Sequence, residues 1–295
     1  MTQLIAGKIG ALAAEGIRDL LTRSLAGEPI ARYTEEDLLG WKTLRDGGWD
    51  EIGVPEEAGG AGASLRDLVE VAMVWGEFCV PLPLVVSLAA KRWSTTAREH
   101  RGPVTVSVFS PGVGPLAPYG NEPGIRVLAR RDGFLSATGG VTDSFPLTLR
   151  PTQVGETTVF DPVASRELAV LWAAESVGAA KRCLRDAVEY AKGRKQFGVP
   201  IGGFQAIKHR AAHMLELTER AETAVLWAAA DDFREGVESI STRRLTLHAL
   251  ATAREVIESA IQIHGGMGFT WEMGVHVYLR HVIALRELVQ GLFQE

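Results

Sequence analysis

Apolar positions recur at helical spacing through roughly the first hundred residues. The pattern is clearest after residue 64, where apolar side chains return every three or four positions, as one face of a helix requires. Residues 34–37 and 64–67 both carry the polar residues typical of a capped helix start. Between them, residues 48–62 are rich in glycine, which predicts a loop. Residues 1–101 are therefore expected to form a helical domain.

The pattern changes between residues 102 and 163. Residues 104–109 and 125–129 alternate and are rich in β-branched side chains, which is typical of strands. Residues 112–114, Gly-Val-Gly, are followed by proline and precede no clear helix, so they are expected to form a loop. This stretch predicts a small, irregular β region, an abbreviated middle domain.

Helical periodicity returns in residues 164–295. Three long amphipathic segments can be drawn at roughly 165–192, 203–232 and 239–264. Gly265 follows the third segment, as a residue that caps the carboxyl end of a helix does. Long helices with short joins favour an antiparallel bundle. The fold class is therefore mostly α with a small β region.

Composition narrows the function classes. The net charge of -5 argues against a nucleic-acid surface, which requires clustered Lys and Arg. The two cysteines, Cys79 and Cys183, lie far apart without a CxxC, so neither a disulfide framework nor a zinc knuckle is expected. No run reaches the roughly 18 apolar residues of a membrane span. The apolar N-terminus lacks the basic start of a signal peptide, so a cytoplasmic location is expected.

The segment from Tyr190 to Lys208 is the first with candidate chemistry. A basic helix end is followed by a turn with glycine and proline, and then by a new helix. In the structural interpretation, which the pattern alone favours, Arg194 compensates the negative end of the helix dipole. In the functional interpretation Arg194 binds a phosphate, because a guanidinium matches phosphate oxygens with two parallel hydrogen bonds.

The segment from Gln262 to Glu272 is the second. Here a helix ends in paired glycines. The structural interpretation is a capped helix end and a turn. The functional one is a close approach of the backbone to a ligand, with Gln262 hydrogen-bonding that ligand. The glycines follow a helix and not a strand, so they do not form a Rossmann fingerprint.

His209 and His213 stand one helical turn apart, as metal ligands can. No glutamate follows His209 and no third ligand is obvious, so this pair is expected to be solvated or packed and not to bind metal.

Taken together, these segments resemble the acyl-CoA dehydrogenase family. The helical, β, helical order matches it, as does the glycine-rich loop 54–62. Residues 194–198, Arg-Lys-Gln-Phe-Gly, and residues 262–268 are similar to the two signatures of the family. The resemblance covers nearly the whole chain and is most specific over residues 165–280. It implies an N-terminal helical domain, a truncated β middle domain and a C-terminal four-helix bundle.

In the family, the two signatures hold FAD across a subunit interface. The resemblance places the pyrophosphate on Arg194 and the adenosine-diphosphate half on Gln205 and the Gln262 segment. The cofactor-binding residues that it implies are Arg194, Gln196, Phe197, Gln205, Gln262, Gly265 and Gly266.

The sequence differs from the family pattern in its middle region, and these differences indicate a partner subunit. Residues 102–163 are short and contain neither the Thr-Glu-Pro-type nor the Trp-Ile-Thr-type stretch that holds the flavin ring and the thioester. Such chains resemble the small subunits of two-gene, α2β2 acyl-CoA dehydrogenases of steroid degradation. The resemblance implies α,β-desaturation of an acyl-CoA, possibly steroid-derived, with a full-length partner subunit. The acceptor would be an electron-transfer flavoprotein or a similar protein. The alternatives are a flavin-free scaffold and a self-sufficient homo-oligomer.

The catalytic base is expected to lie outside this chain. The family places that carboxylate at one of two spots, which align with Val289 and Leu168. Glu287 is two residues from the first spot and Glu167 one residue from the second, so in a helix they are turned away by about 200° and about 100°. Glu287 is the nearest candidate, but both glutamates are expected to be solvated or paired surface charges.

Overall fold

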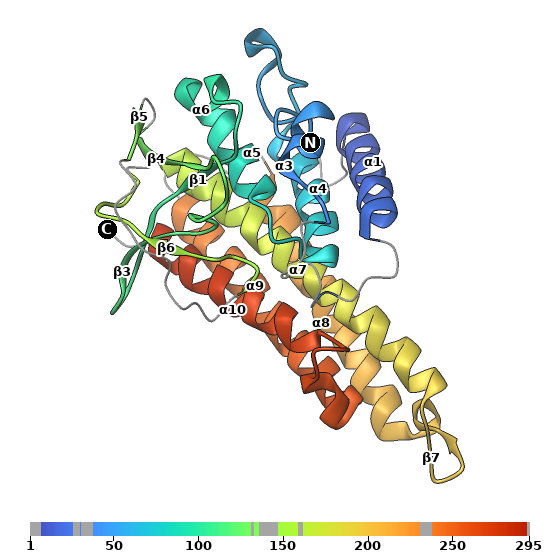
Figure 1. The fold of residues 1–295 in the computed structure, drawn as a ribbon. Helices are drawn as coiled ribbons and strands as arrows, with labels where there is room; N and C mark the ends of the chain where they lie inside the picture. The colour runs from blue at the N-terminus through green and yellow to red at the C-terminus, as the bar shows by residue number, and fades with distance from the viewer. Residues whose placement is uncertain are drawn as a thin grey trace.

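Four C-terminal helices form the body of the molecule, with the N-terminal helices and a β region packed at one end (Figure 1). The structure is a computed structural model that describes residues 7–25, 30, 38–130, 133–135, 147–158, 162–230 and 238–293. Within these ranges the chain runs from helices through short strands to helices again. The expected fold class, mostly α with a small β region, is confirmed.

The N-terminal helices begin where local capping predicts. Helix α4, Leu65–Phe78, starts at Ser64, whose hydroxyl accepts a hydrogen bond from the Asp67 backbone N–H at 3.1 Å. The Asp67 carboxylate accepts in return from the Ser64 backbone N–H at 3.1 Å, which completes a capping box. The capped start expected at 34–37 lies outside the described residues. The other elements of this region are α1 Lys8–Leu25, α3 Trp41–Asp46, the 3-10 turn η1 Glu56–Ala58, α5 Leu84–Trp93 and α6 Thr95–Glu99.

The β region consists of two small sheets. Strand β1, Val104–Val106, pairs in parallel with β4, Arg126–Arg130, and β4 pairs with β5, Gly133–Phe134. The second sheet has the order β2-β3-β6 and is antiparallel. Its strands are β2 Val108–Ser110, β3 Gly114–Ala117 and β6 Thr152–Gln153. The turn expected at 112–114 is present, although Gly114 already begins β3.

The single strand expected at 104–109 is wrong in one respect, because the structure divides it between the two sheets. The break falls at Ser107, whose backbone N–H donates to the Thr158 hydroxyl at 2.7 Å instead of joining a strand ladder. Thr158 is 51 residues away, so no local pattern indicates the break.

The C-terminal region is a four-helix bundle, as expected. The expected segments correspond to α7 Pro162–Gly193, α8 Gln205–Ala229 and α9 Glu238–His264, and the fourth helix is α10 Val275–Leu292. Successive helices run back and forth along one axis, so the carboxyl ends of α7 and α9 point toward the same end of the bundle (Figure 1). That end carries the segments with candidate chemistry.

Helices α4 and α7 touch through their backbones. An added Cβ at Gly76 would lie 1.8 Å from the Glu175 carbonyl oxygen, and one at Gly178 would lie 1.8 Å from the Met73 carbonyl oxygen. Only glycine allows so close an approach. One hydrophobic core accordingly runs from the N-terminal helices through β1 and β2 into the bundle. The domain boundaries expected after residues 101 and 163 stay predictions.

Candidate functional site

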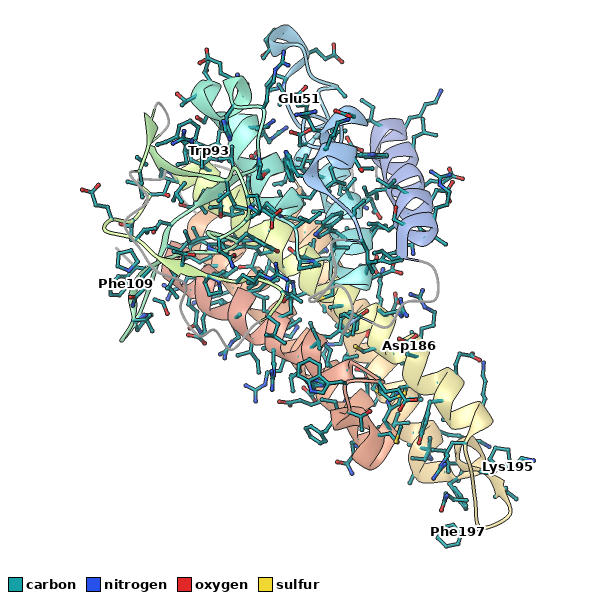
Figure 2. All side chains as sticks on the ribbon, in the orientation of Figure 1. Glu51, Trp93, Phe109, Asp186, Lys195 and Phe197 are labelled. Carbon is teal, nitrogen blue, oxygen red and sulfur yellow. The ribbon has the colours of Figure 1, made fainter. Side chains whose placement is uncertain are left out.

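A β-hairpin forms the tip of the bundle. Strand β7, Lys195–Gln196, follows α7 directly and pairs antiparallel with β8, Val199–Pro200. The two turn residues, Phe197 and Gly198, have φ values of 52° and 82°, as in the tight turns that suit hairpins. Positive φ is uncommon for a bulky residue, yet the Phe197 side chain is 93% exposed at the tip (Figure 2). The short 3-10 turn η2, Ile201–Gly203, then leads into α8.

The predicted site residues of this first segment all face solvent. Arg194, Gln196, Phe197 and Gln205 are exposed. The Arg194 guanidinium has no side-chain partner within the part of the chain that the structure describes. An exposed hydrophobic side chain beside an unpaired guanidinium has little structural purpose in the chain on its own. The arrangement therefore favours a contact with something outside this chain.

The second segment continues α9 into the 3-10 turn η3, Gly265–Phe269. Gln262, Gly265 and Gly266 are exposed, and an added Cβ on either glycine would meet no atom within 4 Å. Gly265 has a φ of 61°, which ends the helix as expected. The backbone here is thus open to a ligand. Phe269 and Trp271 beyond it are 69% and 50% exposed.

The tertiary structure brings the two segments to one end of the molecule. Tyr190, in the last turn of α7, and His264, the last residue of α9, have ring centroids 4.5 Å apart. The predicted residues around Arg194 and those around Gln262 therefore belong to one surface, which we call the bundle tip: residues 190–215 and 262–271.

The bundle tip is basic although the whole chain is acidic. From Tyr190 to Leu215 there is no Asp or Glu, while the net charge of the chain is -5. Every cation of this stretch is exposed: Lys192, Arg194, Lys195, Lys208 and Arg210. Sequence reasoning noticed a basic helix end but missed the continuation into α8, which counting acidic residues would have found. A surface of this charge attracts anionic groups.

The two glutamates near the expected base positions differ from each other. Glu287 on α10 is exposed, while Val289, which occupies the aligned position, is fully buried. Glu167 is 9% exposed and its carboxylate accepts from the Arg92 guanidinium at 3.0 and 3.1 Å. Glu167 is therefore paired, as expected, but it is buried and does not lie at the surface, because Arg92 of α5 covers it. Leu168 beside it is fully buried.

His209 and His213 lie on the exposed side of α8. His213 is 3.5 Å from Glu216 and 3.7 Å from Glu255, with all three side chains more than half exposed. In the described ranges, no group of three His, Cys, Asp or Glu side chains is arranged to hold a metal ion.

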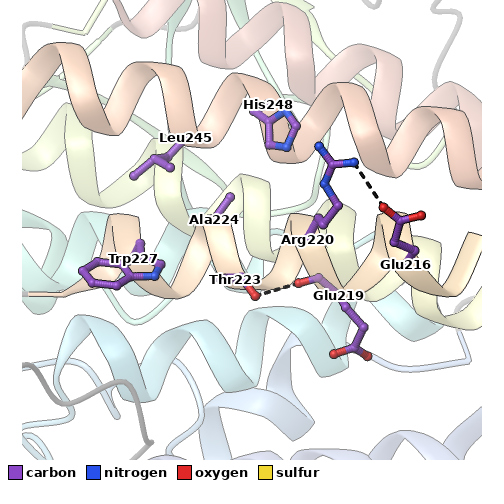
Figure 3. Close-up of a pocket in the computed structure, with 8 residues that line it drawn as sticks. All are labelled: Glu216, Glu219, Arg220, Thr223, Ala224, Trp227, Leu245 and His248. Carbon is purple, nitrogen blue, oxygen red and sulfur yellow. Dashed lines mark hydrogen bonds and ion pairs between the residues drawn. The ribbon is translucent and has the colours of Figure 1, made fainter.

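A cavity of about 450 Å³ lies between α8 and α9, away from the predicted site residues (Figure 3). Trp227, Leu245 and His248 are among the residues that line it. Two of its charged side chains pair with each other, since Arg220 donates to Glu216 at 3.4 Å. Nothing here resembles the convergent polar groups of a cofactor site.

A buried polar network lies where the β region meets the bundle, and sequence analysis did not predict it. His281 of α10 is fully buried, with Nε2 2.9 Å from the Glu175 carboxylate and Nδ1 2.8 Å from the Thr148 hydroxyl. Glu175 stands in the long apolar run of α7, which was the one available signal. Cys79 contacts the same imidazole, and both cysteines of the chain are free and buried.

Comparisons with protein-family models and with known proteins identify relatives of this chain. Residues 167–288 match the family model described as acyl-CoA dehydrogenase, C-terminal domain. Acyl-CoA dehydrogenase IpdE2 of Mycobacterium tuberculosis is 34% identical over 252 residues, which cover 81% of this chain and 78% of that protein. The chain belongs to the acyl-CoA dehydrogenase family. The family is one of flavoprotein oxidoreductases, so the sequence-based classification is confirmed at that level.

Solved structures of the family share the fold. The ChsE4–ChsE5 complex from Mycobacterium tuberculosis superposes with a TM-score of 0.77 at 18% identity, covering 98% of this chain and 95% of that chain. A steroid acyl-CoA dehydrogenase variant, Tcur3481–Tcur3483, gives a TM-score of 0.76 at 19% identity and covers 94% and 91%. Among the described helices, no stretch combines the length and apolar character that a membrane crossing demands.

Proposed function

We propose that this chain is one subunit of an FAD-dependent acyl-CoA dehydrogenase that desaturates an acyl-CoA thioester between its α and β carbons. In this proposal the bundle tip holds the adenosine-diphosphate half of FAD, and a full-length partner subunit supplies the flavin-ring and thioester sites. The observation that carries it is the bundle tip itself, where two separate signature segments meet on one exposed, basic surface.

The residues of the bundle tip suit the cofactor. Arg194 offers a forked guanidinium that no side chain in the described ranges pairs with, of the kind that binds a pyrophosphate with two hydrogen bonds. Gly265 and Gly266 leave the backbone bare, so its polar groups can approach a ligand without a Cβ in the way. Gln205 and Gln262 add exposed amide groups that donate and accept hydrogen bonds. When bound, FAD supplies the electron sink that α,β-desaturation requires.

The rest of the chain supports a catalytic base that lies on the partner subunit. The segment that aligns with the family's base is helical here, and α10 lies directly on β2. An added Cβ at Gly291 would lie 2.2 Å from the Phe109 carbonyl oxygen. Val289 points into the core, so no carboxylate occupies that place. A base must come within hydrogen-bond distance of its proton, which favours a base on the partner.

The comparisons support the choice of partner and substrate class. Two of the similar structures carry paired names, ChsE4–ChsE5 and Tcur3481–Tcur3483, and the second is a steroid acyl-CoA dehydrogenase. We therefore propose an α2β2 heterotetramer acting on a ring-bearing, steroid-derived acyl-CoA. An electron-transfer flavoprotein or a similar protein is the proposed acceptor.

The test is purification of the full chain alone and together with an acyl-CoA dehydrogenase-like partner, which is to be sought among the genes that neighbour its own. Flavin absorbance and native mass are measured for both preparations. The proposal expects little or no FAD on the chain alone, and an α2β2 complex with FAD and fewer flavins than chains. Stoichiometric FAD on the isolated chain would identify a self-sufficient enzyme, and a complex without flavin would identify a scaffold. Either result overturns the proposal.

A further inference from the structure

Two aromatic rings join the two halves of the bundle tip. Tyr190 lies four residues before Arg194, and its carbonyl accepts a hydrogen bond from the Arg194 backbone N–H at 2.8 Å. His264 lies two residues after Gln262 and directly before Gly265. The two rings are 4.5 Å apart with an interplanar angle of 32°. This contact therefore links the helix end that carries Arg194 to the helix end that carries Gln262.

The imidazole of His264 is held in one orientation. Its Nδ1 lies 2.8 Å from the Ala260 carbonyl oxygen, so Nδ1 carries a proton and donates to that oxygen. The residue is 3% exposed, and its Nε2 is buried without a hydrogen-bond partner in the described part of the chain. An unpaired buried polar atom costs stability that an apolar side chain of similar size would not cost. Stability alone therefore does not explain a histidine here.

Ile201 and Ile207 anchor the tip to the core, but the signature residues themselves lie in an exposed layer. Residues 192–200 are all exposed, and none of residues 205–213 at the start of α8 is buried. The Tyr190–His264 contact joins a half-buried ring to a fully covered one, beside the buried Ala191. Ligand-binding groups must be placed to within about half an ångström to act together. A buried contact at the base of both segments is suited to fix their separation.

We propose that Tyr190 and His264 form a positioning pair that sets the distance between the Arg194 half and the Gln262 half of the FAD site. The inference rests on the proposed function, because it concerns the same cofactor. The pair acts through Arg194 and Gln262, which are exposed, while His264 is buried and Tyr190 is half-buried.

The first experiment uses the complex with the partner and distinguishes the effect of each aromatic ring from the effect of its polar atoms. His264→Asn and Tyr190→Leu remove a ring, while His264→Phe and Tyr190→Phe keep it. FAD affinity is measured by fluorescence titration, and the flavin-free complexes are melted in parallel. Aromatic pairs contribute about 0.5–1.5 kcal/mol, so loss of a ring is expected to weaken FAD binding by about three- to tenfold. The ring-keeping variants are expected to bind FAD as the unmodified protein does. Equal FAD affinity in all four variants would overturn the inference.

The second experiment asks whether the pair works through Arg194. In an Arg194→Ala background, Tyr190→Leu is expected to weaken FAD binding by much less than it does alone, since the group that it positions is gone. A general loss of packing would instead reduce affinity by the same factor in both backgrounds, and would contradict the inference.

The third experiment needs no flavin. Spin labels are placed on Lys195→Cys and Glu272→Cys, both exposed sites, while the native Cys79 and Cys183 are buried. A narrow label–label distance distribution is expected, and a broader one in Tyr190→Leu. Unchanged distances would overturn the positioning pair whatever FAD does. Broadened distances with unchanged FAD affinity would instead overturn the FAD site of the proposed function.

Discussion

At the scale of single residues, His281 is the side chain whose state depends most on its surroundings. Burial alone would lower the pKa of its imidazole, but Cys79 and the Glu175 carboxylate outweigh burial and raise that pKa to about 10. Both ring nitrogens then donate, Nε2 to Glu175 and Nδ1 to Thr148. The network connects α10, α7 and the turn around Thr148, so it joins the end of the β region to the bundle.

The free energy of unfolding should therefore depend on the pH above neutrality. The pKa of His281 rises from 6.5 to about 10 on folding, so its contribution is full below pH 6.5 and is lost as the pH rises toward 10. Urea unfolding of the full chain across that window measures the decline. The double variant His281→Phe with Glu175→Leu removes both partners, so its free energy of unfolding should no longer decline across that pH window. Glu175→Leu alone should cost about 3–5 kcal/mol at pH 7, because a buried imidazolium loses its partner. A flat profile in the unmodified chain would contradict the assignment.

Arg194 can be tested with two substitutions. Arg194→Ala should weaken FAD retention in the complex by about 1.5–3 kcal/mol, through loss of a charge-assisted, two-point hydrogen bond. Arg194→Lys keeps the charge but not the fork, so it should recover only part of that loss. Equilibrium dialysis of FAD and thermal melting are the measurements. If Arg194→Ala keeps its flavin but melts early, or if Lys restores everything, Arg194 serves as a helix-end charge.

The two glutamates near the expected base positions should both be dispensable for turnover. Glu287→Gln changes an exposed side chain and should leave kcat within a few fold. Glu167→Gln weakens the pairing with Arg92 and should lower the melting temperature, again without a large change in kcat. Steady-state kinetics of the flavin-loaded complexes provide the check. Removing a general base costs about a hundredfold or more. A loss of that size in either variant would place the base in this chain.

At the scale of secondary-structure elements, helix propensity and packing predict opposite effects for a glycine-to-alanine change where α4 crosses α7. Alanine is a better helix former than glycine by about 1 kcal/mol, so Gly178→Ala would stabilise an isolated helix. In the folded chain its Cβ would lie 1.8 Å from the Met73 carbonyl oxygen, so the two helices must separate. We expect Gly178→Ala to lower the free energy of unfolding by about 1–3 kcal/mol.

The matched control is Gly193→Ala at the end of α7, where an added Cβ meets nothing within 4 Å. This variant should be neutral or slightly stabilising in urea unfolding. If Gly178→Ala behaves like Gly193→Ala, the close backbone contact between α4 and α7 is not present in solution.

At the scale of the whole molecule, charge is separated between the basic bundle tip and the acidic remainder of the chain. If the tip inserts into the partner subunit, association should slow as salt concentration rises, because screening weakens long-range attraction. Reversing Lys208 and Arg210 together to glutamate should lower the association rate about tenfold or more at low salt. Arg23→Glu, an exposed site on α1, is the control and should leave the rate nearly unchanged. Stopped-flow mixing of the two subunits measures both. Equal association rates for the charge-reversed and the unmodified chain would show that the interface lies away from the bundle tip.

The sequence by itself determined the features that depend on neighbours along the chain. The start of α4 at Ser64 and the end of α9 at Gly265 follow from capping groups within a few residues. The helical periods and the two signature segments were equally visible, and with them the family and the residues proposed to hold FAD. Backbone hydrogen bonding and side-chain periodicity are local, so a single sequence contains this information.

Only the tertiary structure decided which distant groups meet. It divided the predicted strand at Ser107, covered Glu167 with Arg92 and placed His281 against Glu175. It also set the rings of Tyr190 and His264 in contact, which makes one surface of two segments. Each of these contacts spans tens of residues, and its free energy comes from burial and charge pairing that exist only after the chain has folded. The order of residue types along the sequence does not reveal these long-range contacts.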